Sequence, residues 1–136
     1  MKPESAKFIE QANICIARTD IMMTVNLYED AARTAYFASF HLAQAYIFER
    51  TGKTSKSHLG VQTEFFRLSK DDTRVDHVLR RFLSQSYEFK SAADYFTGGA
   101  AGTSAQQATE VVARAKLFVE HFASLVSIPD SSPDAI

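Results

Sequence analysis

The sequence has no tryptophan, one cysteine, three prolines and five glycines in 136 residues. The single cysteine, Cys15, excludes a disulfide within the chain, and the four scattered histidines offer no zinc-finger spacing with it. No segment approaches the roughly 20 consecutive apolar residues of a membrane span, and residues 1–10 lack the apolar region of a signal peptide. We therefore expect a cytoplasmic protein with a reduced thiol and no membrane contact. The sequence also predicts no metal site and no cofactor.

An excess of one charge is also absent, because 15 basic and 16 acidic residues leave a net charge of -1. This balance excludes recognition of nucleic acid or anionic lipid through overall charge, so any RNA site must be local. Apolar material is abundant, since 46% of the residues are hydrophobic. A chain of this length and composition suits one domain with one core.

Apolar residues recur at the three- and four-residue spacing of a helix face through most of the chain. Gly52 is a common kind of helix-terminating residue, and Ser104 with Gln107 forms a capping box before the last patterned segment. Gly60 interrupts the third segment, where glycine costs about 1 kcal/mol relative to alanine. The predicted helices span residues 5–25, 28–50, 55–70, 73–96 and 108–126.

These segments predict an all-α fold, an up-and-down antiparallel bundle of four to five helices, because long helices with short connections are mostly antiparallel neighbours. The domain is expected to cover residues 1–127. Residues 128–136 are polar and contain two prolines, so they predict a flexible tail. The segment 28–50 is mostly apolar without Gly or Pro, and it should be the most buried helix.

A line of polar residues runs along the helix predicted at 28–50, within an arc of about 100° when each residue turns by 100°. Apolar residues surround the line, so its side chains must reach solvent, a partner or one another. One interpretation is an ordinary exposed stripe. The other is a site for metal-independent RNA cleavage, in which His41 exchanges protons near neutral pH and Arg33 holds a phosphate. The line consists of Asp30, Arg33, Thr34, His41 and Gln44.

Three short segments together resemble one known family. They are Ala-Tyr-Phe-Ala-Ser-Phe-His at 35–41, Ser-Lys-Ser-His-Leu-Gly-Val at 55–61, and Ala-Asp-Tyr at 93–95. In order and spacing they resemble the segments Ala-Tyr-Tyr-Ala-x-Phe-His, Ser-Lys-Thr-His-x-Gly-Val and Ala-Asp-Tyr of small HEPN proteins, which are often encoded beside minimal nucleotidyltransferases. The resemblance covers residues 28–126.

The resemblance implies either a ribonuclease of a toxin-antitoxin pair or a HEPN protein without cleavage activity. HEPN ribonucleases use an Arg, four to six intervening residues and then a His, contributed by both subunits of a dimer. Here Thr34 stands where the family commonly has that Arg, and Arg33 is one position away. Arg33 and His41 are eight residues apart, hence about 80° around a helix and about 12 Å along it. Lys90 replaces a further family Arg, which keeps the charge but loses the planar fork that binds phosphate.

Two functions therefore remain open. The first is a noncatalytic or degenerate subunit of a two-protein module, which binds a nucleotidyltransferase and a nucleotide or RNA. The second is a metal-independent ribonuclease that uses His41 with Arg33. Both predict a homodimer. The residues expected to bind nucleotide or RNA are Lys56, His58, Lys90, Asp94, Tyr95, Thr34 and Tyr36.

Two further features bear on these functions. Arg114 and His121 also have the ribonuclease spacing, although they lie outside the segments that carry the resemblance. Some toxins of the superfamily carry a Tyr two residues after the catalytic His that the nucleotidyltransferase modifies. Ala43 occupies that position here, which argues against silencing of that kind.

Overall fold

Five helices make up the part of the chain that the structure describes. The structure is a computed structural model, which describes the backbone of residues 1–95 and 102–128 and the side chains of these residues other than 90–95. The described part includes no helix that is both long and apolar enough to cross a membrane. The helices are α1 (Pro3–Thr24), α2 (Tyr28–Thr51), α3 (His58–Ser69), α4 (His77–Tyr95) and α5 (Ala105–Ser127).

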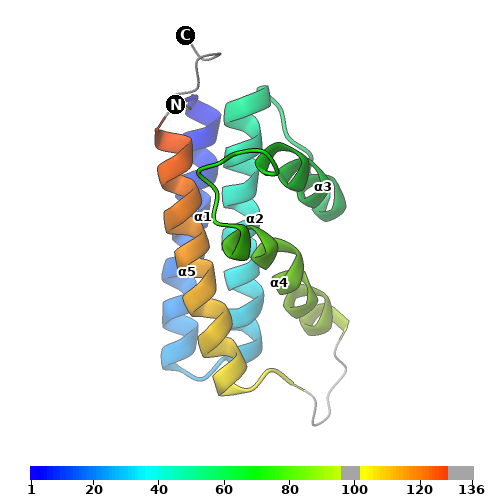
Figure 1. The fold of residues 1–136 in the computed structure, drawn as a ribbon. Helices are drawn as coiled ribbons and strands as arrows, with labels where there is room; N and C mark the ends of the chain where they lie inside the picture. Colours follow the sequence, from blue (N-terminus) through cyan, green and yellow to red (C-terminus); the bar gives the residue numbers. More distant parts are fainter. Residues whose placement is uncertain (96–101, 129–136) are drawn as a thin grey trace.

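Three long helices stand side by side, and two shorter ones lie against them (Figure 1). α1 and α2 are antiparallel neighbours, whereas α5 runs in the same direction as α2 because α3 and α4 return the chain to the other end. The prediction of an all-α helical bundle is confirmed. The predicted domain of residues 1–127 stays a prediction, and the predicted tail lies outside the described residues except for its first residue, Ile128.

α2 is the central helix, because it contacts each of the other four. Its small residues Ala31, Ala35, Ala38 and Ala45 are fully buried and allow the neighbouring helices to approach closely. The prediction that this helix is the most buried is confirmed. The apolar circumference of α2 is thus largely covered within one chain and does not by itself require a second copy.

Two residues with positive φ end the first two helices. Asn26, with a φ of 62°, follows α1. Its N–H donates to the carbonyl of Met23, and the N–H of Leu27 donates to the carbonyl of Met22, which is the hydrogen-bond pattern of a Schellman motif. Gly52, with a φ of 77°, ends α2 as its sequence position predicted.

α3 begins later than the sequence pattern predicted, at His58 and not at Ser55. Ser57 is its N-cap, and the Ser57 hydroxyl accepts a hydrogen bond from the N–H of Gly60 at 3.0 Å. A Cβ atom on Gly60 would lie only 2.3 Å from Oγ of Ser55 and 2.7 Å from Oγ of Ser57. Glycine is therefore needed at position 60, where the loop of residues 55–57, here called the serine loop, folds over the first turn of α3.

The capping box predicted before the last helix is confirmed at the start of α5. Ser104 accepts a hydrogen bond from the N–H of Gln107 at 3.1 Å, and the Gln107 side chain accepts one from the N–H of Ser104 at 2.9 Å. Both bonds satisfy backbone donors that a helix leaves unpaired at its first turn.

We expect Ser104→Ala to lower the free energy of unfolding by about 1 kcal/mol, because it removes one of the two capping bonds. Urea unfolding followed by circular dichroism would measure this change. Ser84→Ala is the control, since Ser84 lies within α4 and bonds only to a carbonyl of its own helix. Equal losses in the two variants would show that the cap has no special role.

Candidate functional site

The candidate site is built along one stretch of α2. The guanidinium carbon of Arg33 lies 5.5 Å from the ring centroid of Phe37, and the ring centroid of His41 lies 6.5 Å from the same centroid. The three residues are spaced by four, so each is about 40° around the helix from the next. The half-buried Phe37 ring therefore lies between a cation and an imidazole that are eight residues apart.

The His41 side chain is held from one side. Its Nδ1 lies 3.0 Å from Oε1 of Gln44, and its ring is 5.6 Å from that of Phe40. Gln44 in turn donates from Nε2 to the carbonyl of Ser55 at 3.2 Å. His41 itself is half-buried, whereas Gln44 is buried. The imidazole is thus anchored to the interior at Nδ1.

A second histidine packs against the same aromatic residues, Phe37 and Phe40. His58, the first residue of α3, shares a hydrogen bond of 2.8 Å between its Nδ1 and the hydroxyl of Tyr36. Its ring centroid lies 4.6 Å from that of Phe40, 5.7 Å from that of Phe37 and 5.5 Å from that of Tyr87. Phe37 and Phe40 therefore contact both histidines.

Tyr36 is fully buried beside His58. Burial raises the pKa of the Tyr36 hydroxyl well above its usual range, although a hydrogen bond with Gln62 opposes the shift. The hydroxyl therefore stays protonated at physiological pH and acts as a neutral partner that orients His58.

The chain matches the family model of the HEPN domain over residues 5–125, which is most of its length. The chain belongs to the HEPN family. A relative from Methanocaldococcus jannaschii, named "Putative toxin MJ0605", is 27% identical over 120 residues, which are 88% of this chain and 87% of the relative. The family predicted from three short segments is thus confirmed, whereas the association with a nucleotidyltransferase stays a prediction.

The remaining residues predicted for the HEPN site are only partly brought together. The Thr34 hydroxyl donates to Sδ of Met22 at 3.5 Å, so it faces α1 and takes no part in the hydrogen bonds of His41. Lys56 is exposed in the loop before α3, two residues from His58. Lys90, Asp94 and Tyr95 lie on α4, but their side chains are outside the part that the structure describes.

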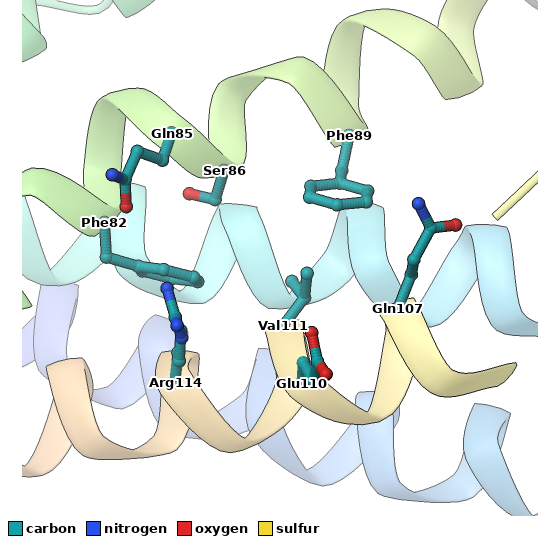
Figure 2. Close-up of a pocket in the computed structure, with 8 residues that line it drawn as sticks. All are labelled: Phe82, Gln85, Ser86, Phe89, Gln107, Glu110, Val111 and Arg114. Carbon is teal, nitrogen blue, oxygen red and sulfur yellow. The ribbon is translucent and has the colours of Figure 1, made fainter. Parts of the chain in front are cut away.

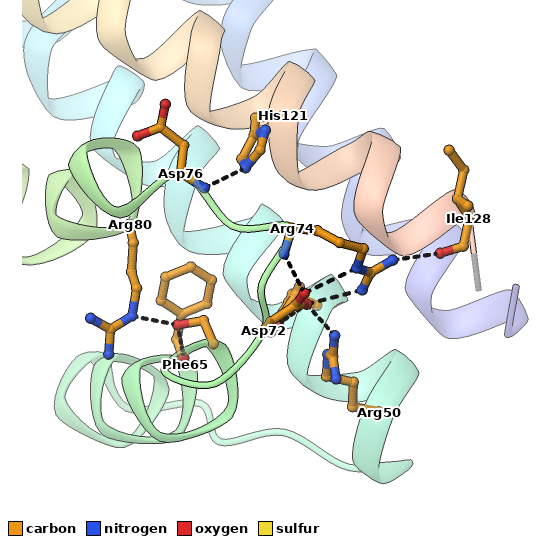
Figure 3. A network of polar contacts seen from close by, with 10 residues as sticks. Arg50, Phe65, Asp72, Arg74, Asp76, Arg80, His121 and Ile128 are labelled. Carbon is orange, nitrogen blue, oxygen red and sulfur yellow. Dashed lines mark hydrogen bonds and ion pairs between the residues drawn. The ribbon is translucent and has the colours of Figure 1, made fainter. Parts of the chain in front are cut away.

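The alternative pair Arg114 and His121 lies in two different surroundings. Arg114 lines a groove of ≈ 260 Å³ between α4 and α5, together with Phe82, Phe89 and Glu110 (Figure 2). His121 accepts a hydrogen bond at Nε2 from the N–H of Asp76, just before α4 (Figure 3). His121 thereby helps to hold the start of α4 against α5, which is a structural role.

Figure 3 also shows a polar cluster around Asp72, which joins three parts of the fold. The Asp72 carboxylate accepts hydrogen bonds from Tyr46 at 2.8 Å, from Arg50, and from Arg74 at 2.9 and 3.0 Å. Arg74 also donates to the carbonyl of Ile128, after α5, at 3.1 Å. The cluster therefore ties the α3–α4 connection to α2 and to the end of α5.

Residues 1–95 and 102–128, which the structure describes, contain no candidate metal site. No three His, Cys, Asp or Glu side chains described there are grouped closely enough to hold an ion. Cys15 packs against the core, and burial raises the pKa of its thiol despite the nearby charge of Arg18. A high thiol pKa makes Cys15 a poor nucleophile and a poor metal ligand.

Sequence reasoning missed two members of this site. The sequence prediction gives Phe37 no role, although its spacing of four from both Arg33 and His41 is a visible signal. Gln44 was placed on the polar line but was given no role. The spacing of three between His41 and Gln44 was a usable signal, whereas the contact with the carbonyl of Ser55 depends on how the following loop folds.

Proposed function

We propose that this HEPN protein is a metal-independent ribonuclease acting on cytoplasmic RNA, with His41 as the general base and Arg33 as the phosphate-binding cation. The observation that carries the proposal is the placement of Arg33 and His41 on either side of the Phe37 ring. Membership of the HEPN family and similarity to a relative named as a toxin support it.

The reaction needs only groups that RNA, water and these two side chains supply. His41 takes the proton of a ribose 2′-hydroxyl while the 2′-oxygen attacks the adjacent phosphorus. The bond from phosphorus to the 5′-oxygen breaks, and that oxygen takes a proton from water. The products are a 2′,3′-cyclic phosphate and a 5′-hydroxyl, and His41 returns its proton to solvent. Arg33 stabilises the negative charge that builds on the phosphate oxygens.

The chain as a whole carries a net charge of -1, so it does not attract RNA through its overall charge. Attraction of RNA to this surface would have to come from local positive charge. Arg33 and the exposed Lys56 are the candidates whose side chains are described, and Lys90 remains a predicted third. A small number of phosphate contacts implies modest affinity that decreases with salt.

Cleavage of a mixed-sequence RNA by the purified protein in EDTA tests the proposal directly. We expect fragments that end in a 2′,3′-cyclic phosphate, which end-group analysis would identify. Intact RNA over a wide range of protein concentration would refute the ribonuclease and leave the second candidate.

The second candidate is a noncatalytic subunit that binds a nucleotidyltransferase and a nucleotide or RNA. The contact of Thr34 with Met22 favours it, because the position at which the resembled family carries Arg supplies no cation to His41. Binding would then involve Lys56 and His58, beside which Leu59 is 75% exposed, whereas the predicted contact Tyr36 is fully buried and would act through its hydrogen bond to His58. Lys90, Asp94 and Tyr95 are further predicted contacts. Purification from the native host should recover a nucleotidyltransferase, and its absence would count against this function.

We expect the protein to form a homodimer in solution. The last turn of α1 and the connection to α2 expose three large apolar side chains, with Ile21 65%, Val25 60% and Leu27 47% exposed, and a second copy would bury them. Sizing with light scattering at micromolar concentration should give about twice the chain mass of 15.2 kDa. A monomeric mass without any partner would contradict the dimer.

A further inference from the structure

We propose that Gln44 is a positioning residue that fixes the tautomer and orientation of the His41 imidazole. The proposal rests on the proposed function, in which His41 takes a proton from RNA. It concerns two hydrogen bonds in series, from His41 to Gln44 at 3.0 Å and from Gln44 to the carbonyl of Ser55 at 3.2 Å.

The carbonyl of Ser55 determines which way the Gln44 amide points. A carbonyl oxygen can only accept a hydrogen bond, so the amide must present its NH₂ group to Ser55. The opposite end of the amide, Oε1, then faces His41. Because Oε1 is also only an acceptor, Nδ1 of His41 must carry the hydrogen in the neutral imidazole.

The Gln44 side chain is itself held in place. Gln44 is only 6% exposed, so water competes little for its amide, and a buried amide without partners is costly. Ser55 is fixed by the loop before α3, where its hydroxyl accepts a hydrogen bond from the N–H of Ser57 at 3.1 Å. The N–H of Gly60 donates to the Ser57 hydroxyl at 3.0 Å, which ties this loop to the first turn of α3.

The consequence for the chemistry is that the basic lone pair of neutral His41 is on Nε2, the ring nitrogen that Gln44 does not hold. When Nε2 takes a proton, the imidazolium keeps its Nδ1–H bond to Gln44, and the partly negative Oε1 stabilises the new charge. Without Gln44 the ring can rotate and can place its hydrogen on Nε2. That nitrogen then has no lone pair with which to take the proton of the 2′-hydroxyl. A side chain that holds an imidazole in its working tautomer is an established element of acid–base sites.

The tautomer can be measured without any activity, from the ring-nitrogen NMR signals of His41 in alkaline buffer, where the imidazole is neutral. We expect the wild type to show hydrogen on Nδ1 and Gln44→Leu to move toward the Nε2–H form. Gln44→Glu keeps an oxygen facing Nδ1 but loses the donor to the carbonyl of Ser55, and a folded Gln44→Glu should retain the wild-type tautomer. The wild-type signal tests the proposal even where neither variant folds. An Nε2–H signal in the wild type would overturn the proposal.

RNA cleavage in EDTA supplies the second readout. We expect Gln44→Leu to lower kcat by about 10- to 100-fold with little change in KM, as for partial loss of a general base. Ser39→Ala, which removes another buried polar group of α2, is the control and should retain wild-type kcat. If the wild type does not cleave RNA, the ribonuclease fails while the tautomer result still stands. If the wild type cleaves and Gln44→Leu keeps its kcat and tautomer, the positioning role alone fails.

Discussion

His41→Ala is expected to lower kcat for RNA cleavage by about 10²- to 10⁴-fold, the range that a positioned general base contributes. The reason is that the described side chains place no second imidazole at the same position. Nδ1 of His58 shares a hydrogen bond with the hydroxyl of Tyr36, and Nε2 of His121 accepts a hydrogen bond from the N–H of Asp76. The measurement is single-turnover cleavage in EDTA at saturating protein.

His77→Ala is the matched control, because His77 is an exposed histidine at the start of α4, away from the candidate site. It should cleave at the wild-type rate. Arg33→Lys keeps the positive charge but loses the planar fork, so its rate should fall between those of the wild type and Arg33→Ala. A His41→Ala variant that is folded and fully active would remove His41 from the mechanism.

The sequence predicted the helices well, apart from the starts of α3 and of α4, which begins at His77 and not at residue 73, because each helix carries its own local signals. The stop at Gly52, the capping box at Ser104 and the apolar periodicity are all set by residues close together in the chain. The start of α3 was predicted too early because Ser55 and Ser57 read equally well as helix starts. Only the packing of the serine loop against Gly60 distinguishes them.

The candidate site was predicted less completely, for a related reason. Its two proposed catalytic residues were found by type and resemblance, and the ring of Phe37 that lies between them could have been found by spacing. The contacts of His41 through Gln44 to Ser55, and of His58 with Tyr36, join residues 14 and 22 positions apart respectively. Such contacts depend on how α3 packs on α2, which local patterns do not determine.

The largest expected effect on stability concerns Asp72. Its side chain is only 4% exposed and faces Arg50 and Arg74, which are 27% and 25% exposed. We expect Asp72→Ala to lower the free energy of unfolding by about 3 kcal/mol, toward the low end for removal of one partner from a buried ion pair. The loss arises because two partly buried guanidinium groups and the Tyr46 hydroxyl lose their shared acceptor. Asp71→Ala, at the exposed neighbouring position, should change stability by less than about 0.5 kcal/mol.

The same carboxylate should make the fold sensitive to acid. Burial by itself would raise the pKa of Asp72, but the hydrogen bonds from Arg74 and Tyr46 outweigh it and hold the pKa well below its usual range. The unfolded chain therefore binds this proton first as the pH falls. The stabilisation is complete above about pH 5 and is progressively lost below about pH 4. Urea unfolding at a series of pH values from about 5 down to about 2 should show a steeper loss of stability in the wild type than in Asp72→Asn, because the amide does not titrate. Parallel pH profiles for the two proteins would show that the Asp72 cluster is not what makes the fold sensitive to acid.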